Sequence, residues 1–488
     1  MKKKYIIISA LVLTGLFNQS CSDDFIEVSP TEQVNVDDLS LYDNNEGATS
    51  FVNSIYAKFL DWDMSSFAWI GVTSITSDDA DKGSTPGDTG SDKDILDALT
   101  FTPSTPSFES LFSSNYQGIN RCNQALKYLP QLNNANTSLR ARLTGEAKFL
   151  RAFMYFTLVR SFGGVPLVDH VPILGNQDDV EMQLTRKSKE EIYAFIEKDL
   201  LDAAEALPNK SQYGTADVGR ATKGAAHALL AKVYLYQKKY QLAIDQCNLV
   251  TGYSLTPTFL DIYKVSGENN AESIFEIQGS GNEKGKGIQQ YTQVQGARGT
   301  GGWGWGFNTP TQNLYDAYTS EGDTERRDAT IIKKGMTLYD GRVVATDADN
   351  NYYNYKAYSS AYTSQSSTDT NIRYLRYAEI LLIKAEALNE LGQTSTAIPL
   401  LNQVRDRAKI ANTTATTQSA LRTAIWKERR LELAFEHDRW FDLVRTGQAQ
   451  SAMAANGKTF VVGKHEVFPL PQTFITEAKG RSAQNPNY

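Results

Sequence analysis

Cysteine and histidine are scarce in this sequence, with three cysteines and four histidines among 488 residues. A disulfide-stabilised scaffold needs more cysteines than this. The histidines are scattered, without the paired helical spacing typical of zinc sites: His170, His227, His437 and His465. We therefore expect neither a disulfide framework nor a metal site. Cys122 and Cys247 lie inside helical patterns and should be buried thiols.

Basic residues are also fewer than acidic ones. The chain has 49 Lys and Arg and 56 Asp and Glu, which gives a net charge of −7. This argues against nucleic acid as a partner, since phosphate binding requires clustered basic residues. The glycine spacing in 279–285 misses the dinucleotide fingerprint by one position, and no nucleophile-elbow motif is present. With 56 acidic residues, some pair of carboxylates will always seem suitable for glycoside cleavage, so this chemistry stays open. None of the motifs identifies a catalytic residue, and we predict no cofactor.

Long hydrophobic runs are missing after residue 17, so no later segment reaches the roughly 20 residues of a membrane-spanning helix. At the start, three lysines precede an apolar run over 5–17, and Ser20 precedes Cys21. This order is typical of a lipoprotein signal peptide. We predict a signal peptide over 1–20 and a lipid on Cys21. The alternative is an ordinary secretory signal that leaves Cys21 as a free thiol.

Residues 21–45 are polar and show little periodicity, so we predict a lipidated flexible tether there. Acidic residues follow Cys21 directly, at positions 23 and 24. They resemble the export tag of lipoproteins that reach the outer cell surface. We expect the anchored chain to face the cell exterior.

Helical periodicity covers much of the remaining chain. In 140–162 the apolar residues fall on one stripe, and Gly163, Gly164 and Pro166 then end the helix. A similar pattern fills 107–129. Another fills 188–206 and begins with a capping-box pair, Ser188 and Glu191.

Two stretches, 222–250 and 372–409, resemble each other as pairs of helices with small residues where they cross. This is the tetratricopeptide type of hairpin. We predict a mainly α fold, with one compact domain over 46–488 that contains a few short strands. Its hairpins are expected at about 107–162, 188–250 and 372–445, and its long irregular loop inserts at about 63–106 and 272–371.

Charges alternate with large apolar residues along 428–442. A catalytic role is possible for such a run, but a partly buried ion-pair network that braces helix packing is the better interpretation. We therefore predict ion pairs between this run and neighbouring helices.

Several blocks together resemble the SusD/RagB family of surface glycan-binding lipoproteins. They occur in the expected order along the mature chain: 146–152 leading into 163–166, 374–379, 426–445, 469–471 and 484–488. The resemblance implies tetratricopeptide-like hairpins, no catalysis, and a location in the outer membrane. It also implies a partner, a SusC-like TonB-dependent transporter on which the lipoprotein sits as a lid.

Sugars present C–H faces that stack on aromatic rings and hydroxyls that need polar partners. The glycine-rich segment 299–308 suits this chemistry, because glycine cannot cover the rings of Trp303 and Trp305. One of the two tryptophans could instead anchor the loop. The predicted glycan contacts are Trp303, Trp305, Tyr291, Arg298, Asn308, Trp69, Asp78, Asp79, Asp81 and Lys82.

The other tryptophans, Trp62, Trp426 and Trp440, lie in helical patterns and are predicted to be core residues. Residues 78–83 faintly resemble a calcium loop but lack its later ligands, so we expect a solvent-exposed acidic loop without metal.

We therefore predict a protein that captures oligosaccharides or polysaccharides at the cell surface and passes them to the transporter. Two alternatives remain open, a surface glycoside hydrolase and a peptide-capturing lid of a similar transporter.

Overall fold

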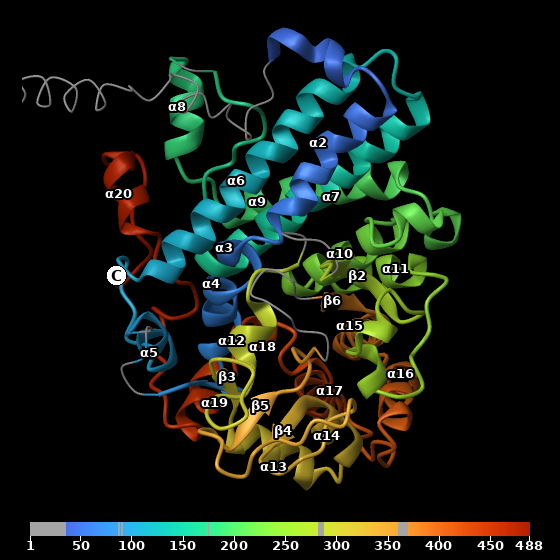
Figure 1. Cartoon of the computed structure of the whole chain (residues 1–488), viewed down its shortest axis with the longest axis vertical. Coiled ribbons are helices and arrows are strands. Elements are labelled where there is room, and N and C mark those ends of the chain that lie inside the picture. The colour runs from blue at the N-terminus through green and yellow to red at the C-terminus, as the bar shows by residue number, and fades with distance from the viewer. Residues whose placement is uncertain (1–35, 86–87, 89–90, 174, 282–286, 360–368) are drawn as a thin grey trace, which may run out of the picture.

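The computed structural model describes residues 36–85, 88, 91–173, 175–281, 287–359 and 369–488. The predicted signal peptide, Cys21 and most of the predicted tether lie outside these residues. Figure 1 shows long helices at one end of the molecule and short strands with shorter helices at the other. The helices before residue 250 are α2 (Asn45–Lys58), α3 (Trp62–Ser65), α4 (Phe67–Ile70), α5 (Ser91–Asp97), α6 (Pro106–Tyr128), α7 (Thr137–Phe162), α8 (Gln177–Leu184), α9 (Lys189–Ala206), α10 (Lys223–Tyr236) and α11 (Tyr240–Leu249).

The second half of the chain alternates strands with helices. Its helices are α12 (Tyr291–Gln295), α13 (Gln312–Ser320), α14 (Thr324–Thr330), α15 (Tyr377–Glu390), α16 (Thr394–Arg407), α17 (Gln418–Leu433), α18 (Arg439–Thr446), α19 (Ala449–Ala455) and α20 (Gln472–Ala478). Three antiparallel strand pairs occur in the described residues: β1 (Ala80–Gly83) with β3 (Phe307–Pro310), β2 (Ser273–Ile277) with β6 (Ile372–Arg376), and β4 (Ile331–Lys333) with β5 (Tyr352–Asn354).

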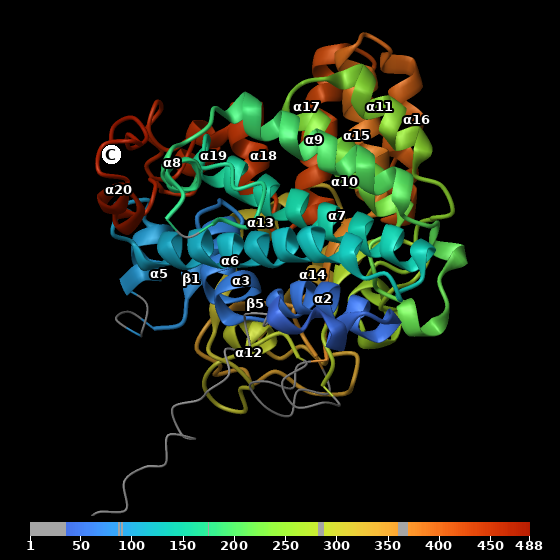
Figure 2. The same cartoon turned by 90° about the horizontal axis from the view of Figure 1, so that it is seen from above.

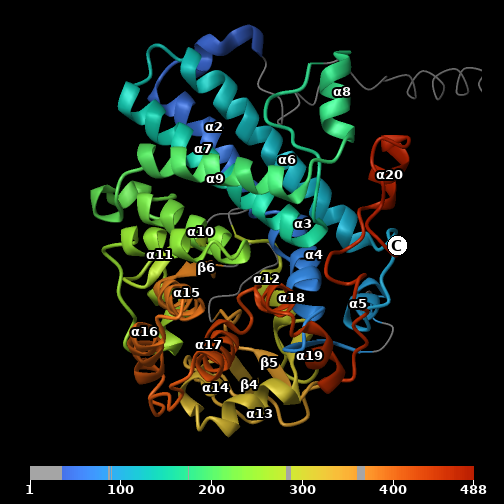
Figure 3. The same ribbon diagram turned by 180° about the vertical axis from the view of Figure 1, so that it is seen from behind.

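The predicted mainly α architecture is confirmed. Helix α7 packs on α6 and α9, α10 packs on α9 and α11, and α15 packs on α16 and α17. Helix α11 also packs on α15, so the hairpins before and after the insert meet in space, as Figures 2 and 3 show. A row of helices therefore forms one side of the molecule although the sequence interrupts it.

Local signals explain where these helices begin and end. Proline occupies the first position of α6, where its missing N–H costs nothing. Ser188 and Glu191 form the predicted capping box of α9. Gly163 ends α7 with φ +73°, a left-handed value that favours glycine.

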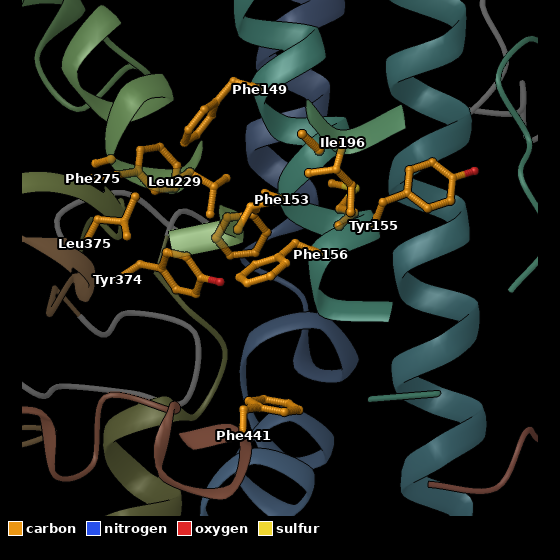
Figure 4. Close-up of a cluster of buried hydrophobic side chains, with 14 of the residues drawn as sticks. Phe149, Phe153, Tyr155, Phe156, Ile196, Leu229, Phe275, Tyr374, Leu375 and Phe441 are labelled. Atoms are coloured by element: carbon orange, nitrogen blue, oxygen red, sulfur yellow. The ribbon is translucent and has the colours of Figure 1, made fainter. Parts of the chain in front are cut away.

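The central core is aromatic. Helix α7 is buried on nearly all sides from Gly145 onward, and its phenylalanines meet the β2–β6 pair (Figure 4). Ring centroids lie 4.9 Å apart for Phe149 and Phe275, and 4.2 Å apart for Phe153 and Tyr374. The strand pair is thereby fixed against the helical row. Cys122 and Cys247 are buried free thiols, as predicted.

The region 63–106 differs from the long loop that was expected. It contains α3, α4, β1 and α5, and the stretch from Ala68 to Ala80 is buried without interruption. The physical reason is a set of apolar residues, among them Trp69, Ile70 and Val72, that join the main core. Abundant Asp, Ser and Thr in the sequence masked this short apolar pattern.

The charged run 428–442 forms the predicted buried ion-pair network. Glu432 on α17 lies 3.0 Å from guanidinium nitrogens of both Arg326 and Arg376 and also pairs with Arg407. Asp438 pairs with Lys232 and Arg160 in the same way. The network joins the helical row to the strand-containing part. In the described residues, no helix is both long and apolar enough to span a membrane.

Candidate functional site

The two segments predicted to bind ligand are adjacent, because β1 pairs with β3. Asp81 lies opposite Thr309, and Gly83 lies opposite Phe307. Just beyond this ladder, Ser84 N donates to Gly306 O over 2.6 Å. A Cβ on Gly83, whose φ is +69°, would lie only 2.3 Å from Gly306 O. The close approach therefore requires glycine at position 83.

The glycine-rich loop after α12 is held by backbone hydrogen bonds. Trp303 N and Gly304 N both donate to Ala297 O over 2.9 Å, and Trp305 N donates to Gln293 O over 2.8 Å. A Cβ on Gly296 would lie 2.6 Å from the Trp303 ring. The loop is thus fixed in a shape that positions both indoles.

The two tryptophans are partly exposed but pack on different neighbours. Trp303 contacts Tyr358 edge-on at 5.3 Å, and the Arg342 guanidinium lies 5.0 Å from the Trp303 ring centre. Trp305 meets Trp62 at 6.1 Å. Each indole is therefore anchored by its neighbours while part of it remains exposed, so each is a candidate stacking surface.

Arg298 connects the loops around this surface. Its guanidinium forms ion pairs with Asp88 and, over 3.3 Å, with Asp349. The side chain remains 33% exposed. It can therefore brace the loops and still offer N–H groups to a ligand hydroxyl.

Three of the predicted contact residues are buried beneath the loops: Trp69, Tyr291 and Asn308. The Tyr291 hydroxyl lies 3.1 Å from Nε2 of His437, and the Thr73 hydroxyl lies 2.9 Å from its Nδ1. Burial lowers the pKa of His437 to about 4, so this imidazole is neutral near pH 7. The cluster holds α12 against the segment after α4.

The acidic residues 78 and 79 do not form the solvent-exposed loop that was expected. Both are 2% exposed. Asp78 receives two hydrogen bonds from Arg439, and Asp79 receives one from Arg430. Burial alone would raise the pKa of Asp78, but the two guanidinium groups outweigh it and lower the pKa to about 2. The arginines from the 428–442 run explain why these carboxylates are inside.

Lys82 and Asp81 differ although they are neighbours in β1. Lys82 is buried and forms an ion pair with Asp94 over 2.7 Å. Asp81 is exposed. Of the predicted contacts in this region, Asp81 alone presents its side chain freely to solvent.

Trp62 is a residue that the sequence pattern assigned to the core, but its side chain is partly exposed beside Trp305. Polar Asp61 and Asp63 on both sides of it were the available signal. Trp426, also expected in the core, is partly exposed, and its Nε1 donates to Glu386 over 3.2 Å. Trp440, in contrast, is 1% exposed and stacks on Phe468 at 5.3 Å, as a core residue should. Gln289, Arg342 and Tyr358 were also missed, because they lie in irregular segments without periodicity.

Several hollows lie elsewhere on the surface. A groove of about 430 Å³ runs between α6 and residues 166–172, and one of about 620 Å³ lies beside residues 412–417. Within the described part of the chain, no group of His, Cys, Asp and Glu is arranged to hold a metal ion.

The fold and the loop surface define a class of protein: a body of helical hairpins that carries aromatic, glycine-rich loops on one side. Two family models match this chain, one described as the SusD family over residues 271–488 and one as starch-binding associating with outer membrane over 24–235. The chain belongs to the SusD family.

Individual relatives agree with this assignment. SusD-like protein P2 of Formosa agariphila is 28% identical over 410 residues, which cover 76% of this chain and 79% of that protein. The starch-binding protein SusD of Bacteroides thetaiotaomicron is 25% identical over 467 residues, 80% of this chain and 81% of that protein. A solved laminarin-binding SusD-like protein superimposes with a TM-score of 0.77 at 29% identity, covering 91% of this chain and all of the other.

Proposed function

We propose that this chain captures glycans at the cell surface and delivers them to a SusC-like TonB-dependent transporter. The observation that carries the proposal is the pair of partly exposed indoles, Trp303 and Trp305, on a loop fixed by backbone hydrogen bonds. Exposed indoles favour the C–H faces of sugars. Two related proteins support the ligand class, since one is named as starch-binding and the other as laminarin-binding.

Among the predicted contacts, the exposed or partly exposed ones would touch the glycan directly: Trp303, Trp305, Arg298 and Asp81. The buried ones would act indirectly, by holding the loops in place: Trp69, Asp78, Asp79, Lys82, Tyr291 and Asn308. The protein would bind without cleaving. In support, the carboxylates of Asp78 and Asp79 are buried and paired with Arg439 and Arg430, as parts of an ion-pair network that holds the loops.

A glycan array with the mature protein tests the proposal. Replacement of Trp303 or Trp305 by Ala should weaken binding about tenfold, or about 1.4 kcal/mol. Trp426→Ala is the matched control, because Trp426 is a partly exposed tryptophan on the distant α17. Binding of peptides and no glycans would instead favour a peptide-capturing lid, and release of reducing ends from a bound glycan would favour a hydrolase.

One matching family model is described as associating with the outer membrane. How this chain is attached to that membrane is a separate proposal. We propose that a lipid on Cys21 anchors the chain, with the loop surface outward. Mass spectrometry of the mature N-terminus should find an acylated cysteine, and Cys21→Ser should release the protein from the membrane fraction. An unmodified residue 21 in membrane-bound protein would contradict the anchor.

The transporter partner is testable separately. The intact lipoprotein, purified from membranes in mild detergent, should co-purify with a TonB-dependent transporter. Its recovery without any such transporter, under conditions that preserve other outer-membrane complexes, would contradict the lid arrangement.

A further inference from the structure

A second aromatic surface adjoins Trp305 at the start of α3. The ring centres of Trp62 and Trp305 lie 6.1 Å apart, with their planes at 68°. Phe67 supports Trp62 from another side at 5.1 Å. Both indoles are partly exposed. The two rings therefore form a corner, with one wall from α3 and the other from the glycine-rich loop.

Gln289 lies at this corner in a fixed position. Its backbone N–H donates to Leu60 O over 3.0 Å, and its side-chain Oε1 accepts from Trp62 N over 3.1 Å. The carbonyl end of the amide is thus engaged. The Nε2 end has no hydrogen-bond partner within the described residues, and the side chain is exposed. The two N–H donors of Nε2 are thus held beside the first residue of α3.

The charges around the corner are unfavourable for an anionic ligand. Asp61 is 43% exposed, and Asp63 is also partly exposed. Among the described residues, two lysines near the corner are buried and paired: Lys58 donates to Asp61 and Gln117, and Lys93 donates to Asp92 and Ser107. Within this described part of the chain, a carboxylated or sulfated sugar would therefore meet exposed acidic side chains at the corner.

We propose that Trp62, Trp305 and Gln289 form a subsite for an uncharged sugar unit. A pyranose stacks its C–H face on one indole while its rim meets the other, and Gln289 Nε2 donates to a ring hydroxyl. This inference rests on the proposed glycan-binding function and deepens it, because it adds two residues and a charge class to the Trp305 side of the surface.

Isothermal titration of the mature protein tests the subsite with a defined set of probes. The neutral probes are hexaoses of laminarin, maltose, cellulose and xylan, and the anionic probe is an alginate hexamer. At least one neutral hexaose should bind, and the alginate hexamer should not. For the neutral hexaose that binds, Trp62→Ala should weaken affinity at least fivefold and Gln289→Ala about threefold.

Two further variants separate binding from folding. Trp62→Phe keeps a stacking ring and should retain most of the affinity for the hexaose. Trp426→Ala removes an equally large ring from α17 and should leave this affinity unchanged. Gln289→Ala removes an exposed side chain and one hydrogen bond, the one from Trp62 N, so it should lower the melting temperature by no more than about 2–4 °C. It therefore tests the subsite even where Trp62→Ala disturbs α3.

Each outcome has one interpretation. Binding of a neutral hexaose that is unaffected by both Trp62→Ala and Gln289→Ala overturns the subsite and leaves the glycan-binding function standing. Binding of the alginate hexamer, alone or together with a neutral hexaose, overturns the assignment to uncharged sugars. Absence of binding to every probe and to the glycan array overturns the subsite together with the proposed function.

Discussion

The carboxylate of Asp78 is stabilised by two arginines, and this makes its contribution to stability depend on pH. Its folded-state pKa of about 2 lies below the ordinary value of 3.8. A lowered carboxyl pKa contributes stability that is complete above the unfolded-state value and is lost as pH falls through the folded-state value. Asp78→Asn removes this contribution and should cost about 2 kcal/mol at pH 7.

Guanidinium unfolding of both proteins at pH 7, 5, 3 and 2 measures the effect. The difference in unfolding free energy should be constant from pH 7 to 5 and shrink between about pH 4 and pH 2. The exposed Asp347 provides a control, since Asp347→Asn should unfold like the unaltered protein at each pH. A difference between Asp78→Asn and the unaltered protein that persists undiminished at pH 2 would show that packing, and not charge, is responsible.

At the scale of elements, the loop after α12 depends on glycine at position 296. A Cβ there would lie 2.6 Å from the Trp303 ring and 3.1 Å from Gly304 Cα. Gly296→Ala should displace Trp303, cost about 1–3 kcal/mol in stability, and weaken glycan binding. Thermal unfolding and titration with the bound hexaose measure both effects. Gly214→Ala should change neither, because nothing lies within 4 Å of a Cβ at position 214. A Gly296→Ala variant that melts and binds normally would contradict the expected close packing.

The long helices could be predicted from sequence because burial imposes a 3.6-residue period, as in α6, α7 and α9. Their ends were marked by local chemistry, such as the capping box at Ser188. The short elements between 63 and 106 could not be predicted from sequence, because a helix of four residues such as α4 has too few positions to establish a period. Packing from distant parts of the chain decides such segments.

The candidate site was less predictable for the same reason. The glycine-rich composition around Trp303 and Trp305 correctly singled out partly exposed indoles. Asp78 appeared equally suitable as a glycan contact, but it is buried and paired with Arg439, which lies 361 positions away in the sequence. Local sequence carries no information about such a partner. Trp62 was misjudged in the opposite direction, because a helical pattern does not reveal which of its faces a distant loop covers.

At the scale of the whole molecule, one carboxylate links four elements. Glu432 on α17 binds Arg326 on α14, Arg376 on β6 and Arg407 on α16. The side chains of all four residues are almost completely buried. A buried ion network contributes little to stability compared with apolar packing. The loss of one charged partner is nevertheless costly, because it leaves the other charges buried and unpaired. The helical row and the strand-containing part should therefore unfold together.

Glu432→Gln tests this coupling, because it removes the charge and keeps the shape. We expect a loss of about 3–5 kcal/mol in the free energy of unfolding. The dependence on denaturant should remain that of a single transition, because the aromatic core between α7 and the β2–β6 pair still joins the two parts. Glu325→Gln is the matched control, as the Glu325 pair with Lys409 is exposed and should be worth less than about 1 kcal/mol. A second transition in Glu432→Gln, with the β2–β6 region losing hydrogen-exchange protection before the hairpins, would contradict this expectation. It would show that the Glu432 network, and not the aromatic core of α7 and the β2–β6 pair, holds the two parts together.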